Sequence, residues 1–375
     1  MVPVERRRFL QTLAVASIGP WLSACAGEDR QAGEPFEEED ETQSLAQAAA
    51  ASGRSFGTAV SAATLRTRSH GYSAVLGQCS SITPEWSMKW DRLCPKPGRY
   101  DFGEADRIAD FARSQARRLR GHTLLWHLGM PRWADALLAQ TREWRHVSGY
   151  FHTVMPRYAD VVDEWDVVNE PIGTGAEADG LRASQFLQAF GPDYIDWAFW
   201  TAREAAPKAR LFVNEYGLEY ALAEEGRRRL ALLRLVEGLL KRGVPVHGVG
   251  LQAHLDLRKG KVYADGVYGL LRDLSNFGLR VSVTELDVRE SDQKMPLKAR
   301  DAAVADEVRR FLDVALDFAA VRSISTWGLS DGDSWLATRS GGRADNRGLP
   351  YDRDWRRKPM RTAIETALRG SRRHA

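Results

Sequence analysis

The chain has 375 residues, of which 43% are hydrophobic and 27% are charged, and its formal net charge is +3. This length and composition are typical of a soluble globular protein with one large domain or two ordinary ones. A nucleic-acid-binding protein gathers Lys and Arg on one element, whereas the basic residues here are scattered, so we expect no nucleic-acid partner.

The N-terminal 25 residues have the pattern of a bacterial export signal. Residues 5–10 (ERRRFL) carry a twin-arginine motif. An apolar stretch follows as far as Leu22 and is too short to span a bilayer comfortably. We therefore expect the protein to be exported through a twin-arginine-type signal and to reach the periplasm or the cell exterior.

Residues 22–25 (LSAC) resemble a lipobox, in which Cys25 would be lipidated and become the mature N-terminus. The interpretation that we favour is a membrane-anchored lipoprotein, tethered through Cys25 on the periplasmic or outer face. The alternative is an ordinary signal cleaved near Ala24 or Ala26, which would leave the protein secreted and Cys25 incidental.

Residues 26–50 are predicted to form an acidic flexible linker. Glu34 and the run 37–41 (EEEDE) repel one another, and few large apolar residues are available for burial. Beyond the linker, only Cys79 and Cys94 remain, and two cysteines of unknown geometry leave open whether they form a disulfide.

From residue 51 onward, short apolar runs alternate with longer amphipathic patterns. The predicted strands are Phe56–Val60, Gln78–Ile82, Arg118–Leu125, Val161–Val168, Arg210–Asn214, Val246–Leu251, Leu279–Thr284 and Ser323–Trp327, and predicted helices between them include 105–117, 194–205, 226–242 and 301–320. Eight such units predict the α/β class and a (β/α)8 TIM barrel, as one domain over residues 51–370. The alternative, an open doubly wound sheet, would carry a Gly-rich phosphate loop that this sequence lacks.

The helix predicted over residues 226–242 contains Arg227, Arg228, Arg229 and Arg234. In an amphipathic helix, charged residues of this kind usually form the solvated face. The sequence thus predicts that these four arginines form the charged face of the helix.

Two carboxylates stand near the ends of predicted strands. The run WDVVNEP places Glu170 after a β-branched strand that Pro171 terminates, and VSVTELDV places Glu285 near the end of another strand. A carboxylate at the end of a buried strand is costly unless chemistry or a partner keeps it there. Paired carboxylates at the strand ends of a barrel are typical of retaining glycosidases.

Polar and aromatic residues follow the other predicted strands as well. They are Glu85 and Lys89 after the second strand, His127 after the third, Asn169 at the fourth, Asn214, Glu215 and Tyr216 at the fifth, Gln252 and His254 after the sixth, Asp287 at the seventh and Trp327 at the eighth. In a TIM barrel, these positions line the face on which active sites lie.

Five motifs in this order resemble glycoside hydrolase family 10, the retaining β-1,4-xylanases. They are GHTLLWH (121–127), WDVVNEP (165–171), GLQAHL (250–255), TELDV (284–288) and WGLSDGDSW (327–335). The resemblance extends from about residue 56 to residue 368. It implies a TIM barrel and an enzyme that needs no metal or organic cofactor.

The resemblance also implies catalytic roles. Glu285 matches the nucleophile and Glu170 matches the general acid/base, which must begin the reaction protonated. His254 matches the histidine that bridges the nucleophile and Asp287, and this contact would favour the ionised nucleophile. Two supporting matches remain: Asn169 matches the residue that bonds the sugar 2-hydroxyl, and Gln252 matches a partner near the acid/base.

Substrate contacts follow from the same resemblance. Glu85, Lys89 and His127 match residues that bind sugars on the non-reducing side of the cleavage point. Aromatic matches are Trp327 and Trp335, as walls around those sugars, and Tyr216, as a stacking platform on the leaving-group side. Three departures affect substrate contacts: Trp86-Ser87 stands where the family has Asn after the Glu, Leu128-Gly129 replaces Ser-Gln, and Gly217 replaces Asn. We expect Trp86 to alter binding of the second non-reducing sugar.

The sequence thus predicts a monomeric endo-β-1,4-xylanase that hydrolyses internal bonds of xylan with retention of configuration. One alternative is a β-1,4-glycosidase that acts on another β-glycan or on decorated xylan. Another is a non-catalytic carbohydrate-binding lipoprotein, but such a protein would be free to lose Glu170 or Glu285, and both are present.

Overall fold

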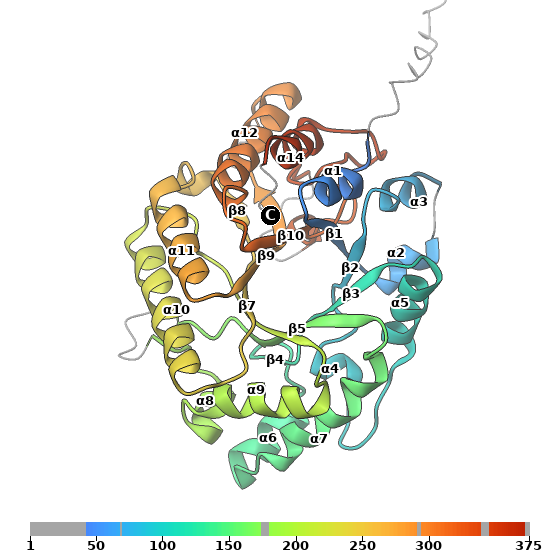
Figure 1. Cartoon of the computed structure of the whole chain (residues 1–375). Helices are drawn as coiled ribbons and strands as arrows, with labels where there is room; N and C mark the ends of the chain where they lie inside the picture. The colour runs from blue at the N-terminus through green and yellow to red at the C-terminus, as the bar shows by residue number, and fades with distance from the viewer. Residues whose placement is uncertain (1–42, 68–69, 174–179, 291–293, 339–344, 372–375) are drawn as a thin grey trace, which may run out of the picture. The chain divides into compact units, whose positions relative to one another are not determined.

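The computed structural model describes residues 43–67, 70–173, 180–290, 294–338 and 345–371 (Figure 1). All that follows refers to these residues. The export signal, Cys25 and linker residues 26–42 lie outside them.

Within the described residues, eight parallel strands form a closed barrel at the centre of the domain (Figure 1). They are β1 (Ser55–Val60), β2 (Ser81–Pro84), β3 (Arg118–Gly121), β5 (Val162–Asn169), β6 (Arg210–Glu215), β7 (Gly248–Leu251), β9 (Arg280–Arg289) and β10 (Val321–Thr326). The barrel closes because β10 pairs with both β9 and β1, with Thr58 opposite Thr326. The (β/α)8 prediction is confirmed, and the open sheet is wrong.

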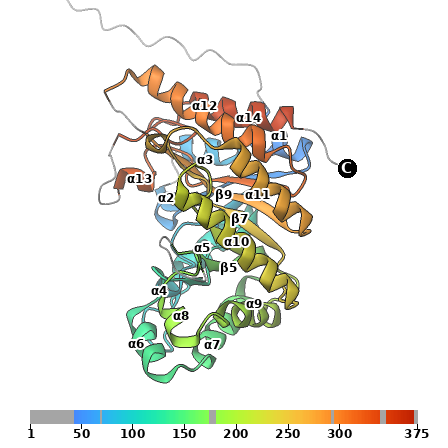
Figure 2. The same cartoon turned by 90° about the vertical axis from the view of Figure 1, so that its left-hand side faces the viewer.

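Helices surround the barrel on its outside (Figures 1 and 2). They are α1 (Leu45–Ala51), α2 (Ala62–Thr67), α3 (His70–Leu76), α4 (Trp90–Leu93), α5 (Gly103–Ser114), α6 (Arg132–Thr141), α7 (Arg145–Val154), α8 (Gln185–Phe190), α9 (Tyr194–Ala205), α10 (Ala223–Lys241), α11 (Ala264–Asn276), α12 (Leu297–Ala315), α13 (Trp335–Thr338) and α14 (Pro359–Gly370). Short 3-10 turns occur at Pro156–Tyr158 and Leu257–Lys259. In α12, Val304, Val308 and Phe311 recur at helical spacing and are buried against the barrel. No helix in the described part is long and apolar enough to cross a membrane.

The third predicted strand is interrupted. The sequence predicted one strand over Arg118–Leu125, but β3 ends at Gly121 and a separate two-residue strand, β4 (Leu125–Trp126), follows. Between them the chain bonds to one residue of β5: Leu124 N–H and the Thr123 hydroxyl both donate to the Asp166 carbonyl, at 3.0 and 2.9 Å. The regular ladder is lost there, so the prediction of one continuous strand is wrong.

Other strand boundaries differ from the prediction by one or two residues, and two differ by about three residues or more. The second strand begins at Ser81, because Gln78 and Cys79 belong to the turn that follows α3. The seventh predicted strand corresponds to β9, which runs to Arg289, well past Glu285, because β8 (His254–Asp256) pairs with its last residues. Glu285 therefore lies inside a strand rather than at its tip.

The folded domain begins before residue 51. Residues 45–51 form α1, whose Leu45, Ala48 and Ala49 are fully buried, and Ser44 and Gln47 form a capping box at its start. The linker prediction is therefore wrong for residues 43–50. Alanines are readily buried in a closely packed helix, whereas the linker was predicted from the scarcity of large apolar residues alone.

The charged arginine face predicted for residues 226–242 is not solvated at two of its four positions. Arg228 and Arg229 are buried in α10 and bond to the loop that follows β6. Arg228 donates to the Glu215 carboxylate at 2.6 Å, and Arg229 donates to the Leu218 and Tyr220 carbonyls at 2.9 and 3.0 Å. Buried guanidinium groups require such partners, and a single helix pattern does not reveal them.

Cys79 and Cys94 are both free and buried. Burial raises the pKa of the Cys79 thiol to about 12. The Cys94 thiol donates to the Lys96 carbonyl at 3.2 Å. Cys79 and Cys94 therefore do not form a disulfide with each other in the structure.

Candidate active site

The two predicted catalytic carboxylates lie at the carboxyl-terminal face of the barrel and are linked by three amide side chains. Asn214 Nδ2 donates to Glu285 Oε1 at 2.7 Å and to Asn169 Oδ1 at 2.8 Å. Gln252 Nε2 donates to Asn169 Oδ1 and to Glu170 Oε1, both at 3.3 Å. The amides come from β5, β6 and the end of β7, so closing the barrel brings the two carboxylates together.

Asn214 is central to this chain of bonds, and the sequence singled it out only as one of several strand-end polar residues. Its own amide oxygen accepts a hydrogen bond from the Thr284 hydroxyl at 2.8 Å, which fixes the amide orientation. A Cβ at Gly250 would lie 2.1 Å from the Asn214 amide oxygen, so only glycine leaves room for this side chain. The spacing of residues in the sequence carries no sign of this contact.

Glu285 is held by a histidine and a second carboxylate, as the resemblance implied. His254 Nε2 lies 3.2 Å from Glu285 Oε2, and Nδ1 lies 2.8 Å from Asp287 Oδ1. The other Asp287 oxygen accepts from Trp335 Nε1 at 2.5 Å. Burial lowers the pKa of His254, but the nearby carboxylates of Asp287 and Glu285 outweigh it and raise the pKa to about 10. The imidazolium therefore donates from both nitrogens at neutral pH.

The raised pKa of His254 makes stability depend on pH in a defined direction. The unfolded value is 6.5 and the folded value about 10, so stabilisation is complete below pH 6.5 and is lost as the pH rises through about 10. Between these values the folded protein holds one more proton at this site, which lowers the unfolding free energy by about 1.4 kcal/mol per pH unit.

This prediction is tested by comparing wild type with His254→Gln in denaturant titrations at pH 7, 8 and 9. We expect the difference in unfolding free energy between the two proteins to shrink steadily with rising pH. Lys89, whose pKa is lowered to about 8 mainly by burial, titrates in the same window but is common to both proteins. A difference that stays constant with pH would contradict the assignment.

A second buried charged group, Asp166, lies in β5, four residues before Glu170. Asp166 accepts from Arg120 through both oxygens and lies 3.0 Å from His122 Nδ1. Burial raises the pKa of Glu285, but the His254 hydrogen bond and the electrostatic effects of His122, His254 and Lys89 outweigh burial, so the pKa is lowered. No role was predicted for Arg120, His122 or Asp166. The available signal is that Asp166 is a charged residue directly before the buried apolar pair Val167-Val168.

Glu85, Trp86 and Lys89 form one contact group after β2. The Lys89 ammonium lies 3.9 Å from the centre of the Trp86 ring and 4.3 Å from that of Trp126, and Lys89 is almost fully buried. Trp86 Nε1 donates to Glu85 Oε1 at 3.1 Å, while 44% of Trp86 stays exposed. The pKa of Glu85 is raised by burial, against the opposing effects of Lys89 and Trp86.

Trp327 and Trp335 flank the His254 side of the site. The Trp327 ring lies 5.2 Å from the His122 ring and 6.3 Å from the His254 ring. Trp335 lies 5.1 Å from His254. Because the Trp335 indole N–H donates a hydrogen bond to Asp287, Trp335 orients that carboxylate.

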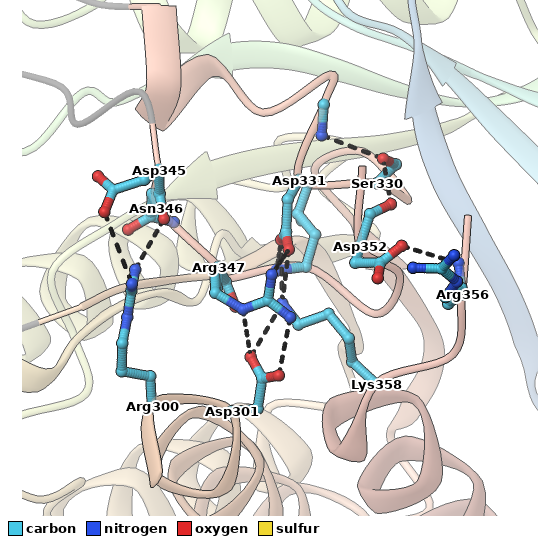
Figure 3. Close-up of polar contacts among 12 residues, drawn as sticks. Arg300, Asp301, Ser330, Asp331, Asp345, Asn346, Arg347, Asp352, Arg356 and Lys358 are labelled. Carbon is cyan, nitrogen blue, oxygen red and sulfur yellow. Dashed lines mark hydrogen bonds and ion pairs between the residues drawn. The ribbon is translucent and has the colours of Figure 1, made fainter. Parts of the chain in front are cut away.

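A network of buried ion pairs fixes the segment that carries these two tryptophans (Figure 3). Lys358 Nζ donates to both Asp331 oxygens, at 3.0 and 2.9 Å, and Arg347 donates to both oxygens of Asp301 in α12, at 2.8 Å each. Asp331 and Lys358 are almost fully buried. Removing one partner of such a pair costs about 3–5 kcal/mol, so the network holds the Trp327–Trp335 segment firmly.

Tyr216 and His127 lie near Glu170. The Tyr216 hydroxyl accepts from Arg182 Nη2 at 3.0 Å, and His127 Nδ1 lies 4.0 Å from Glu170 Oε2. Burial, together with the charge of Arg182, lowers the pKa of His127 to about 4, so this imidazole is neutral at pH 7. The resemblance implies that His127 binds a sugar on the non-reducing side, and this role stays a prediction; in the structure His127 lies beside Glu170.

Burial also affects Glu215, which lies behind the site. Burial raises the pKa of the Glu215 carboxyl to about 7. The charge of Arg228 lowers this pKa, and the charge of Glu170 raises it further. The Ile172 N–H donates to Glu215 Oε2 at 2.8 Å. The pair Glu215–Arg228 therefore supports the backbone that follows Glu170.

The arrangement provides two carboxylates in different surroundings, a neighbouring imidazolium and aromatic walls. In the described ranges, no group of three or more His, Cys, Asp or Glu residues is placed to hold a metal ion. Paired carboxylates of this kind perform acid/base and nucleophilic chemistry at an acetal carbon.

Comparison with known proteins gives a consistent result. Residues 44–367 match the model of the family described as Glycosyl hydrolase family 10. Endo-1,4-beta-xylanase 3 of Hypocrea jecorina is 30% identical over 309 residues, which cover 82% of this chain and 81% of that protein. Exoglucanase XynX of Acetivibrio thermocellus is 31% identical over 300 residues, which cover 76% of this chain and 26% of that protein.

Among solved structures, xylanase 10B from Thermotoga petrophila RKU-1 in complex with xylobiose superposes with a TM-score of 0.78 at 28% identity, covering 88% of this chain and 98% of that one. The family match covers the whole barrel, including the segments that carry both carboxylates. The chain therefore belongs to glycosyl hydrolase family 10.

Proposed function

We propose that this protein is an endo-β-1,4-xylanase that cleaves internal xylosidic bonds with retention, using Glu285 as the nucleophile and Glu170 as the general acid/base. The family match and the xylanase relatives support the activity. The observation that supports the residue assignment most directly is the bonding chain from Glu285 through Asn214, Asn169 and Gln252 to Glu170.

The reaction would proceed in two displacements. Glu285 attacks the anomeric carbon while Glu170 gives its proton to the departing glycosidic oxygen, which forms a glycosyl-enzyme ester. Glu170, now a carboxylate, takes a proton from a water molecule that attacks the same carbon and releases Glu285. His254 donates to Glu285 at 3.2 Å and so favours the carboxylate form before attack.

The amide of Asn169 would bond the 2-hydroxyl of the sugar that reacts, a contact that strengthens in the transition state. Glu85, Lys89, Trp327 and Trp335 would bind sugars on the non-reducing side, and Tyr216 would stack under the leaving group. His127, neutral at pH 7, would add a hydrogen bond near Glu170.

The activity is tested with the full chain on β-1,4-xylan. We expect release of reducing sugar and, in proton NMR of early products, the β-anomer before mutarotation, since double displacement retains configuration. Appearance of the α-anomer first would contradict the nucleophilic role of Glu285. Binding of xylan without any hydrolysis would favour the carbohydrate-binding lipoprotein instead.

Another β-glycan remains the second candidate substrate. It is favoured by Trp86, which takes the place of the family Asn, and by the similarity to a relative named an exoglucanase. Parallel assays on xylan, arabinoxylan and β-1,4-glucan distinguish these possibilities.

Replacing Trp86 with asparagine should strengthen binding of the second sugar on the non-reducing side. The change frees the Glu85 carboxylate and uncovers the Lys89 ammonium, so that both can bond sugar hydroxyls. At about 1 kcal/mol for a hydrogen bond, we expect a roughly fivefold shift in the xylobiose-to-xylotriose ratio from short xylo-oligosaccharides. The control is Trp86→Phe, which keeps a ring over Lys89. An unchanged product ladder in Trp86→Asn would refute a role for this residue.

We further propose that the protein is exported through its twin-arginine signal, is anchored through a lipidated Cys25 and acts as a monomer. The residue pattern of the first 25 positions supports the export signal and the anchor, and the monomeric state is the plain default. Labelling cells with a fatty-acid analogue tests the anchor, since the label should disappear in Cys25→Ser. Label retained by that variant would refute the lipobox.

A further inference from the structure

The backbone of Glu170 has an uncommon conformation. Its φ is +57°, in the left-handed region that residues with a side chain seldom adopt. Contacts on both sides of the residue maintain it: Glu170 N–H donates to the Asn214 carbonyl at 2.8 Å, and the Glu170 carbonyl accepts from Arg182 Nε at 2.7 Å. The direction of the Glu170 side chain therefore depends on both bonds.

Arg182 reaches Glu170 because the chain folds back on itself after β5. Ile172 and Leu181 form an antiparallel bridge, and the Arg182 N–H donates to the Pro171 carbonyl at 2.7 Å. The guanidinium then bonds in two directions, with Nε on the Glu170 carbonyl and Nη2 on the Tyr216 hydroxyl at 3.0 Å. A planar guanidinium with fixed donor directions suits this double contact, whereas an ammonium has a single donor centre.

We propose that Arg182 is a positioning residue for the general acid: by holding the Glu170 carbonyl and the Tyr216 hydroxyl together, it aims the Glu170 carboxyl at the departing glycosidic oxygen. This inference rests on the proposed function. Arg182 bonds the backbone of Glu170 and leaves its carboxyl free, and that carboxyl is bonded only to Gln252 among the described residues. The guanidinium thus orients the acid without taking up its oxygens.

The charges that surround Glu170 fit this role. Glu170 interacts electrostatically with Arg182 in the loop after β5, with Lys89 in the segment after β2 and with Glu215 at the end of β6, and His127 Nδ1 lies 4.0 Å from its carboxyl. The charge of Arg182 also helps to keep the pKa of His127 at about 4, so the imidazole beside the acid stays neutral. Removal of Arg182 should therefore raise the pKa of His127 as well as loosen Glu170.

Leaving-group dependence separates positioning of the acid from general structural support. The phenolate of phenyl β-xylobioside is a poor leaving group and needs a proton from the general acid. The 2,4-dinitrophenolate of 2,4-dinitrophenyl β-xylobioside departs without one. A displacement of about 1 Å at a reacting group costs about 10²-fold in rate. We expect Arg182→Ala to lower kcat/KM for the phenyl substrate by about 30–100-fold and that for the dinitrophenyl substrate less than threefold.

Graded variants refine the test. Tyr216→Phe removes one of the two contacts of the Arg182 guanidinium. It should lower kcat/KM for the phenyl substrate more than for the dinitrophenyl substrate, but by a smaller factor than Arg182→Ala. Arg182→Lys keeps the positive charge but loses the planar guanidinium. Its kcat/KM for the phenyl substrate should lie between those of wild type and Arg182→Ala. Arg227→Ala, an exposed arginine on α10, is the matched control and should match wild type on both substrates.

The proposal would be overturned if Arg182→Ala lost activity on neither substrate. It would also be overturned if Arg182→Lys and Tyr216→Phe, like Arg182→Ala, lost activity equally on both substrates. The dinitrophenyl substrate also reports folding, because a misfolded variant loses activity on it too; in that event Arg182→Lys and Tyr216→Phe decide. If wild type cleaves neither substrate, the proposed function itself fails, which is a separate outcome.

Discussion

Replacing Glu285 with alanine should abolish hydrolysis of xylan, with a loss on the order of 10⁵-fold in kcat, as expected when a nucleophile is removed. The carboxylate is buried, receives hydrogen bonds from Asn214 and His254, and has a lowered pKa. No other described carboxylate receives hydrogen bonds from both of these residues, so the first displacement has no substitute. The measurement is the initial rate of reducing-sugar release by the purified full chain.

Azide identifies what the missing group did. In Glu285→Ala, azide can enter the vacated space and displace the activated aryl group of 2,4-dinitrophenyl β-xylobioside from the opposite face. The product expected is the α-glycosyl azide, formed with inversion. Glu224→Ala, at an exposed glutamate in the first turn of α10, serves as the control and should retain wild-type activity. Substantial xylan hydrolysis by Glu285→Ala would remove this residue from the mechanism.

Replacing Glu170 with alanine should give a loss that depends on the substrate. General acid/base catalysis contributes about 10²–10⁴-fold, so hydrolysis of xylan should fall by about that factor. The first step on an activated dinitrophenyl substrate needs no proton and should persist, so the glycosyl-enzyme should accumulate. Steady-state rates together with a burst of dinitrophenol measure these two effects.

The same reagent then distinguishes the two carboxylates. In Glu170→Ala, azide attacks the accumulated glycosyl-enzyme in place of activated water, and the product is the β-glycosyl azide, with configuration retained. Azide should restore turnover in proportion to its concentration. An α-azide from this variant, or a uniform loss on all substrates, would contradict the role of Glu170 as acid/base.

The barrel was predictable because its signals are local and repeated. Several strands contain β-branched apolar residues, as in β9, and outer helices such as α9 and α12 have a stripe of buried residues. Eight consecutive strand–helix units predict that the sheet closes into a barrel. The boundaries were less predictable, since the break after Gly121 and the extension of β9 to Arg289 depend on bonds to Asp166 and on pairing with β8.

The site was predictable where motifs carry it. The pair Glu170 and Glu285, with His254 and Asp287, follows from sequence motifs at strand ends, and the structure brings all four to one place. Their catalytic roles stay predictions until the variants are measured.

Residues that act through long-range contacts were not predictable. Arg182 lies 12 positions after Glu170 and bonds its carbonyl, and Arg228 reaches Glu215 from a helix whose pattern suggested solvent. Burying a guanidinium depends on acceptors brought by other elements, so neither periodicity nor spacing could indicate it.

Pairing of the first barrel strand with the last has a consequence for how the protein matures. Thr58 of β1 and Thr326 of β10 are 268 positions apart and lie side by side. Because such distant partners must meet, folding should be slow, and the ring cannot close until nearly the whole domain has left the ribosome. Trp327 comes directly after β10, so the strand that closes the ring also delivers this wall of the site. Enzymatic activity of a nascent chain would therefore report the moment of closure.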